Sequence, residues 1–260
     1  CLSANPTSVD FALSEEQRLV LQQTIKAVKA GEFKSEWTPE QKVDAYLTAM
    51  NCYACHQQRG KGGLDDARSV YFTVHQPAAH SLGEIGMLPP KLDDTGRKLT
   101  VKWMEKLLWG EGGGVRPYMT ARMPKFGEAN VKELIPTWVE ACKKHPETQI
   151  DTTGLLKHHR SEYGRQLLGI GEGGLGCVSC HGLKDRESLG VPVIKLTQTV
   201  DRLTPEYFKD LLLNPQAIQS GTLMPPLFAG RKKAEQEIEQ IWTYLKEVDQ
   251  FRLPEGLVQM

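Results

Sequence analysis

The sequences CYACH at Cys52–His56 and CVSCH at Cys177–His181 repeat one pattern, Cys-x-x-Cys-His, and hold four of the six cysteines of this 260-residue chain. With six cysteines and seven histidines in the chain, chance would give on the order of 0.004 such matches. Two matches therefore indicate two sites with the same chemistry, and the rest of the chain must supply a fold around each of them.

Three kinds of site use paired cysteines. A redox dithiol of the thioredoxin kind needs a nearby βαβ pattern, which this sequence lacks. A zinc finger separates its cysteine pair from its histidine, whereas here histidine follows the second cysteine directly. Covalent attachment of haem c fits the pattern: the two thiols form thioethers and the adjacent histidine binds the iron. The predicted attachment residues are Cys52, Cys55, His56, Cys177, Cys180 and His181.

The sequence also contains an internal repeat. LTVKWMEKLLW at Leu99–Trp109 aligns without gaps on LTPEYFKDLLL at Leu203–Leu213, and each copy offers a threonine as helix N-cap. Each copy follows a Cys-x-x-Cys-His pattern and precedes a Met-Pro pair and a segment with tryptophan near its end. A pattern that occurs twice indicates duplicated domains, since a solenoid needs three or more units. We expect domains at 1–147 and 148–260, joined by the polar stretch at 145–154.

Helix signals dominate the chain. SEEQ at Ser14–Gln17 is a capping box, and TPEQ at Thr38–Gln41 combines a threonine cap with proline at the first helical position. The one candidate strand, Val191–Leu196, is interrupted by Pro192. The sequence therefore predicts an all-α fold of two tandem helical domains, the first preceded by an N-terminal helical extension.

A second axial ligand is expected from the Met-Pro pairs, because a thioether sulfur favours Fe(II) and raises the reduction potential. Met224 is the predicted ligand of the second haem, and Met123 that of the first. Met119 lies one helical turn before Met123 and is a rival sulfur. The loop histidines His75 and His80 are interpreted as structural residues.

Both halves resemble class I cytochrome c domains. The first half resembles them through NCYACHQQRGKGG, LPPKL and RPYMTARMPKFG, and is similar to domains appended to large bacterial oxidoreductases; the second half does so through GRQLLGIGEGGLGCVSCHG and LMPPL. The resemblance covers about 42–142 and 161–248. It implies two covalently bound haem c groups attached outside the cytoplasm, hence a periplasmic or other extracytoplasmic protein. Arg116, with Arg97 and Arg202 as further candidates, is expected to pair with a haem propionate.

The charge and hydropathy of the chain limit the classes of partner that it is expected to bind. The number of lysines plus arginines equals that of aspartates plus glutamates, at 32 each. The net charge therefore gives no strong electrostatic field that would favour binding to nucleic acid. No apolar run approaches the ~18 residues of a transmembrane helix. Cys1 and Cys142 remain outside the two patterns. They are interpreted as a disulfide pair, or Cys1 as the site of a lipid anchor, or both as unpaired thiols.

These features favour a dihaem cytochrome that carries electrons between a protein donor and a protein acceptor. One alternative is an enzyme, a dihaem peroxidase or other haem oxidoreductase in which the first iron has an open distal side. Another is the electron-entry subunit of a larger redox complex, with the N-terminal helices as a docking element. No residue of the sequence stands out as catalytic.

Overall fold

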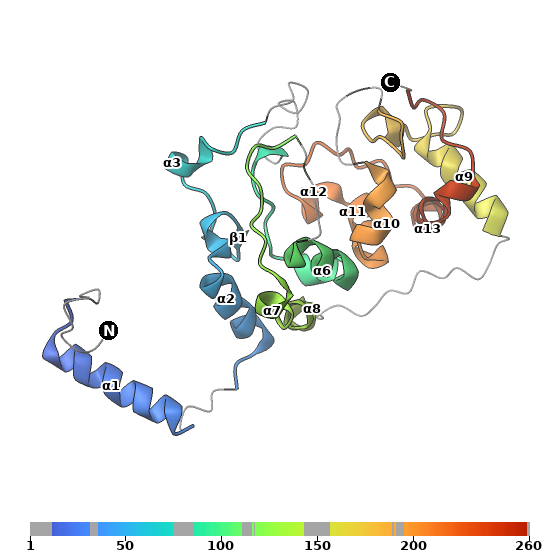
Figure 1. Cartoon of the computed structure of the whole chain (residues 1–260). Coiled ribbons are helices and arrows are strands. Elements are labelled where there is room, and N and C mark those ends of the chain that lie inside the picture. Colours follow the sequence, from blue (N-terminus) through green and yellow to red (C-terminus); the bar gives the residue numbers. More distant parts are fainter. Residues whose placement is uncertain are drawn as a thin grey trace. The chain divides into compact units, whose positions relative to one another are not determined.

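The computed structural model describes residues 12–31, 36–74, 86–110, 116, 118–142, 157–188, 190 and 195–258 (Figure 1). Most of these residues are helical, which confirms the predicted helical class. The chain divides into two compact units, residues 1–38 and residues 39–260. The predicted domain boundary at 147/148 lies outside the described residues and stays a prediction.

The described residues of the first unit include helix α1 (Glu15–Lys29). Its capping box forms as predicted: the amide of Gln17 donates to the Ser14 hydroxyl, and the amide of Ser14 donates to the Gln17 side chain. None of its residues is buried. The helix therefore depends on its caps and its own hydrogen bonds and not on a core within its unit.

The second unit begins with the elements of the first repeat. They are α2 (Pro39–Ala49), η1 (Cys52–Ala54), α3 (Asp66–Ser69), α5 (Thr95–Lys98), α6 (Val101–Trp109), α7 (Glu128–Val131) and α8 (Leu134–Cys142). Helix α2 packs against α8 through Val43, Leu47, Leu134 and Trp138, all nearly inaccessible to water. This pairing holds the segment that leads into Cys52 against the end of the repeat.

The second repeat has the same order with a larger core. Its elements are α9 (Lys157–Leu168), η3 (Cys177–Ser179), η4 (Leu196–Gln198), α10 (Thr199–Arg202), α11 (Pro205–Leu213), α12 (Pro215–Ile218), α13 (Ala234–Lys246) and η5 (Val248–Gln250). Helix α9 lies against α13 (Figure 1), where Leu167 packs with Ile238, Ile241 and Tyr244. The helix before the second Cys-x-x-Cys-His pattern thus packs on the last long helix, as in the first repeat.

A short hairpin adds strand structure that the sequence did not predict. Strands β1 (Gln57–Gln58) and β2 (Lys61–Gly62) pair antiparallel directly after His56. Both connecting residues have positive φ, 48° at Arg59 and 76° at Gly60. This backbone suits the tight two-residue turns that match the twist of paired strands. Two-residue strands are too short to show any alternation of polar and apolar residues, which is why the all-α expectation missed them.

The aligned segments of the repeat form helices α6 and α11, and these begin and end at aligned positions. Thr100 and Thr204 are their N-caps, each accepting a hydrogen bond from the amide three residues on. Just before them, Leu99 and Leu203 form an isolated antiparallel bridge. The equivalent points of the two repeats therefore meet each other within the second unit.

Candidate functional site

The two Cys-x-x-Cys-His segments adopt the same backbone conformation. Each forms a 3-10 turn in which the amides of the second cysteine and of the histidine both donate to the carbonyl of the first cysteine. In the first copy the Cys55 and His56 amides lie 3.1 and 2.8 Å from the Cys52 carbonyl; in the second, the Cys180 and His181 amides lie 3.2 and 3.0 Å from that of Cys177. The turn holds two thiols and one imidazole in one compact arrangement.

A left-handed residue precedes each turn. Asn51 has a φ of 54° and Gly176 a φ of 71°. This conformation ends the preceding segment and redirects the chain into the turn. Asparagine and glycine are the residue types that adopt it at the lowest cost, so the local sequence favours the same turn in both repeats.

The imidazole of His56 is oriented by a main-chain carbonyl. Its Nδ1 lies 2.8 Å from the carbonyl oxygen of Pro90. A carbonyl can only accept, so Nδ1 carries the proton, and Nε2 of the neutral ring keeps its lone pair. Burial lowers the pKa of His56, and the positive charge of Arg116 lowers it further, although the Pro90 carbonyl opposes both effects. The ring is thus prepared as a neutral nitrogen ligand.

Burial favours the protonated form at the first thiol of each turn. Burial raises the pKa of Cys52 and raises that of Cys177 to about 11. Cys52, Cys55 and Cys177 are half-buried and Cys180 is exposed, and each is a free thiol. A redox-active dithiol needs a lowered thiol pKa. The raised values at Cys52 and Cys177 do not fit that chemistry.

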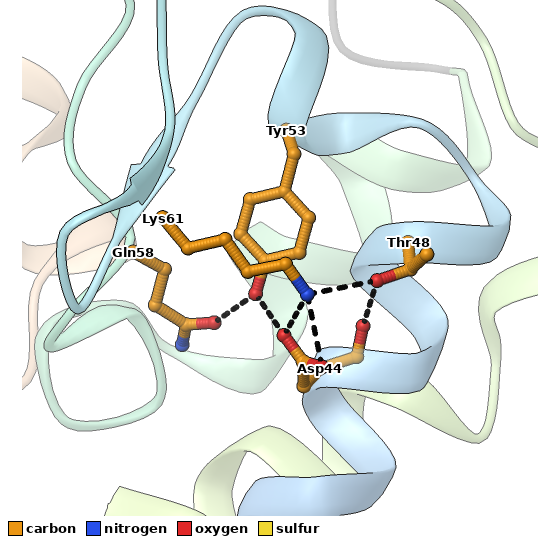
Figure 2. Close-up of polar contacts among 5 residues, drawn as sticks. All are labelled: Asp44, Thr48, Tyr53, Gln58 and Lys61. Atoms are coloured by element: carbon orange, nitrogen blue, oxygen red, sulfur yellow. Dashed lines mark hydrogen bonds and ion pairs between the residues drawn. The ribbon is translucent and has the colours of Figure 1, made fainter.

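Polar contacts anchor the first turn to helix α2 (Figure 2). The hydroxyl of Tyr53, which lies between the two cysteines, donates to Asp44 at 2.6 Å. The ammonium of Lys61, in the hairpin, lies 2.8 Å from the same carboxylate. The hydrogen bond and charge of Lys61, followed by the hydrogen bond of Tyr53, lower the pKa of Asp44. Asp44 therefore joins the helix, the turn and the hairpin at one ionised carboxylate.

The positive charge of Arg116 contributes to the lowered pKa of His56. Its guanidinium donates to the carbonyls of Gly86 and Leu88, at 3.1 and 2.7 Å. Burial lowers the pKa of Arg116. Two main-chain carbonyls thus fix the guanidinium of Arg116, and its predicted pairing with a haem propionate stays a prediction.

The candidate sulfur ligands occupy different surroundings. Met224 is half-buried against the second core, and its carbonyl accepts from Gln216. Met119 is 6% exposed, packs with Val74 and Tyr118, and its sulfur lies 3.9 Å from Arg116. Met123 is 40% exposed. The structure thus brings the sulfur of Met119 to the guanidinium of Arg116, and the choice of Met123 as ligand stays a prediction.

Buried hydrogen-bond donors without an acceptor test whether a haem would fit. Trp109 and Trp138 each bury an indole N–H, and Arg202 buries its Nε–H, with no acceptor among the residues whose placement is described. An unsatisfied buried donor is costly and needs an explanation. Haem carries two propionate carboxylates, which are strong acceptors, so these donors and the thiol and imidazole set suit haem c.

Several predicted features lie outside the described residues: Cys1 and its proposed disulfide or lipid, His75, His80 and residues 191–194 of the candidate strand. Among the residues with a described placement, no group of three or more histidine, cysteine, aspartate or glutamate side chains could hold a metal ion. Within the same residues, no helix is long and apolar enough to cross a membrane.

Three residues of the site were not singled out from the sequence. Pro90 lies in the LPPKL segment, but its carbonyl carries no side-chain signal. Tyr53 occupies a variable position of the motif, and Asp44 is one of several polar positions of an amphipathic helix, so neither carried a signal of its own.

Comparison with family models, with curated proteins and with solved structures found no match to this chain.

Proposed function

We propose that the chain is a dihaem c-type cytochrome of two cytochrome c-like domains that carries electrons between protein partners. The observation that supports this most is the matched geometry of the two Cys-x-x-Cys-His turns, together with the orientation of His56 by Pro90. Two independent turns present the same groups in the same arrangement. A histidine tautomer held by a carbonyl is the usual arrangement around a ligating imidazole.

In this proposal the four thiols add to the vinyl groups of two haems, so that each S–H gives its sulfur to one vinyl carbon and its hydrogen to the other. The bound haem supplies an iron that cycles between Fe(II) and Fe(III). His56 and His181 bind the irons through nitrogen. The Pro90 carbonyl, by accepting from Nδ1 of His56, makes Nε2 a better donor.

A methionine sulfur would help to hold each haem iron. Met224 serves the second haem, and Met123 the first, with Met119 as the alternative. Two sulfur-ligated irons need no open position, because an electron moves between proteins without substrate binding to the metal. Arg116, whose guanidinium is held by the main-chain carbonyls of Gly86 and Leu88, would supply positive charge for a propionate.

The partners are a protein donor and a protein acceptor outside the cytoplasm. The formal net charge of zero supports recognition through small contact surfaces and not through a strong general field. A role as the electron-entry subunit of a larger redox complex would use the same two haems. It differs from the role of a free carrier only in that a partner stays bound.

The test is a count of covalent haems. We expect the full chain, produced in an extracytoplasmic compartment, to retain two haems after denaturation, measured by mass spectrometry and by the spectrum of the reduced protein. C52S/C55S and C177S/C180S should each retain one. C142S, which removes a thiol outside both patterns, should retain two. A wild-type chain without covalent haem would overturn the proposal.

Carbon monoxide separates the carrier from the enzyme. It binds reduced iron only where the distal position is open or its ligand is easily displaced. We expect neither haem of the reduced wild-type protein to bind it. Ready binding at the haem of Cys52–His56 would instead favour a haem oxidoreductase whose reaction occurs at the first iron.

A further inference from the structure

Two hydrogen bonds recur at equivalent places in the two repeats, just after each Cys-x-x-Cys-His turn. In the first repeat the amide of Leu92 donates to the carbonyl of Gln57, the residue after His56, at 2.9 Å. The amide of Arg59 donates to the carboxylate of Asp93 at 2.7 Å. Two consecutive residues of a distant segment are thus joined to the chain that leaves the histidine.

The second repeat forms the same pair of bonds. The amide of Leu196 donates to the carbonyl of Gly182, the residue after His181, at 2.9 Å. The amide of Lys184 donates to the hydroxyl of Thr197 at 2.6 Å. Leu196 and Thr197 align without a gap on their counterparts of the first repeat, and Gly182 and Lys184 keep the same distances from the histidine as theirs. The arrangement is therefore common to both repeats, although one acceptor is a carboxylate and the other a hydroxyl.

Each side-chain bond holds a residue in an uncommon backbone conformation. The φ angle is 48° at Arg59 and 55° at Lys184. Residues other than glycine rarely adopt positive φ, and they keep it where the surrounding structure holds them there. Asp93 and Thr197 supply that restraint, since each accepts from the amide of the left-handed residue. The same strained residue with the same kind of partner in both repeats indicates a built feature of the site.

In the first repeat the segment held in this way carries the carbonyl that orients His56. Pro90, whose carbonyl oxygen lies 2.8 Å from Nδ1 of His56, comes two residues before Leu92. Leu92 is buried in the core between α2 and α8, and the ring of Pro90 fixes its φ. The hairpin that follows His56 is in turn anchored on α2 by an ion pair (Figure 2). The position of the carbonyl therefore depends on how firmly this segment is held to the hairpin.

We propose that Asp93 is a positioning residue for the first haem: by holding the amide of Arg59, it keeps the carbonyl of Pro90 on Nδ1 of His56. This inference rests on the proposed function and deepens it. Asp93 acts through Arg59 and Pro90 and not as a ligand of the iron. Its removal should weaken the hydrogen bond to the imidazole while the ring still binds the iron.

The direction of the effect follows from the basicity of the imidazole. A carbonyl that accepts from Nδ1 makes Nε2 a better donor to the iron, and a better donor favours Fe(III), which carries one more positive charge than Fe(II). A loosened Pro90 carbonyl should therefore raise the reduction potential of the first haem. Loss of the negative charge of Asp93 acts in the same direction. The test must separate the lost hydrogen bond from the lost charge.

Three substitutions of Asp93 make this separation. Asp93→Asn removes the charge but keeps a carbonyl oxygen that can accept from the amide of Arg59. Asp93→Thr removes the charge and places there the residue type that accepts in the second repeat. Asp93→Ala removes both the charge and the acceptor. Asp66→Asn, at an exposed position of α3, is the matched control for the loss of one carboxylate from the first repeat.

The experiment is a spectroelectrochemical titration of the full dihaem chain and these variants. We expect Asp93→Ala to raise the potential of the first haem clearly more than Asp93→Asn or Asp93→Thr does, and Asp66→Asn to leave it near the wild-type value. The potential of the second haem should stay unchanged in all of them and serves as an internal reference. The same comparison in C177S/C180S, which should retain the first haem alone, assigns the potential that responds.

Hydrogen exchange gives a readout that does not depend on redox chemistry. In the reduced protein, the amide of Arg59 and the Nδ1 proton of His56 should exchange with solvent faster in Asp93→Ala than in Asp93→Asn, measured by NMR. Residues with a general structural role would change the overall stability without this local difference.

Equal potentials of the first haem in Asp93→Ala and Asp93→Asn, in chains that carry both haems, would overturn the inference. A shift of both potentials in Asp93→Ala would also overturn it, because the effect would then be general. A wild-type chain without covalent haem would overturn the proposed function as well. The haem count of each chain is determined first, so the two failures can be told apart.

Discussion

Gly164 of helix α9 meets the main chain of Gln240 in helix α13 so closely that a Cβ on Gly164 would lie 2.1 Å from the Gln240 carbonyl oxygen. Alanine would be favoured in an isolated helix by about 1 kcal/mol. The clash should outweigh this preference, because the obstacle is main chain and cannot rotate away. We expect Gly164→Ala to lower the free energy of unfolding by about 1–3 kcal/mol, as overpacked cores do, measured by denaturant titration.

Gln236→Ala is the matched control for this prediction. Gln236 is exposed on helix α13, so its substitution should change the unfolding free energy by less than about 0.5 kcal/mol. Equal stability of Gly164→Ala and the wild-type chain would show that the two helices can separate at this crossing without cost.

The carboxylate of Asp44 gives a pH-dependent contribution to stability. Its pKa in the folded protein is lowered by Lys61 and Tyr53, below the unfolded value of about 3.9. A lowered carboxyl pKa contributes stability that is present above the unfolded pKa and is lost as pH falls through the folded one. We expect Asp44→Asn to lower the unfolding free energy by about 1 kcal/mol at pH 7.

The stability difference between Asp44→Asn and the wild-type chain should shrink below about pH 4, measured by denaturant titrations at several pH values. Asp66→Asn, at an exposed position of α3, controls for a general change of charge. A difference that stays constant from pH 7 to the acid limit would mean that ionised Asp44 contributes nothing to the network.

The hydroxyl of Thr204 has two roles that a substitution separates. It accepts from the amide of Tyr207 at the start of α11 and donates to the carbonyl of Arg97 in the other repeat, at 2.6 Å. Thr204→Ala removes a cap and a contact between the repeats, so we expect a loss of about 1–2 kcal/mol in thermal or denaturant unfolding. Thr204→Ser keeps the hydroxyl and should lose clearly less. A serine variant as unstable as the alanine variant would assign the effect to the lost methyl group.

The distal ligands can be assigned by carbon monoxide binding to reduced single variants. We expect Met224→Ala to open the second haem and Met123→Ala the first. Met119→Ala should leave both closed, while losing about 2–4 kcal/mol of stability because Met119 is buried. Binding at the first haem of Met119→Ala, together with a closed first haem in Met123→Ala, would make Met119 the ligand.

The features predicted correctly from the sequence are those with a local cause. Ser14, Thr100 and Thr204 begin helices because a short side chain there satisfies amides a few residues away. Pro39 begins α2 for another local reason, because its fixed φ suits the first helical position and no N–H is needed there. The positions of the two Cys-x-x-Cys-His turns follow from the motif itself, and their shared backbone follows from the residue in front of each.

The features missed depend on residues far apart in the chain. The pairing of His56 with Pro90 and that of Leu99 with Leu203 join segments whose separation leaves no periodic signal.

The bonds between the repeats are reciprocal. Thr100 donates its hydroxyl to the carbonyl of Asp201, and Thr204 donates its hydroxyl to the aligned carbonyl of Arg97. Equivalent surfaces that contact each other in this way are those of a dimer with a twofold axis. At the Leu99–Leu203 bridge the two repeats thus contact each other within one polypeptide in the way that two subunits do across a twofold axis.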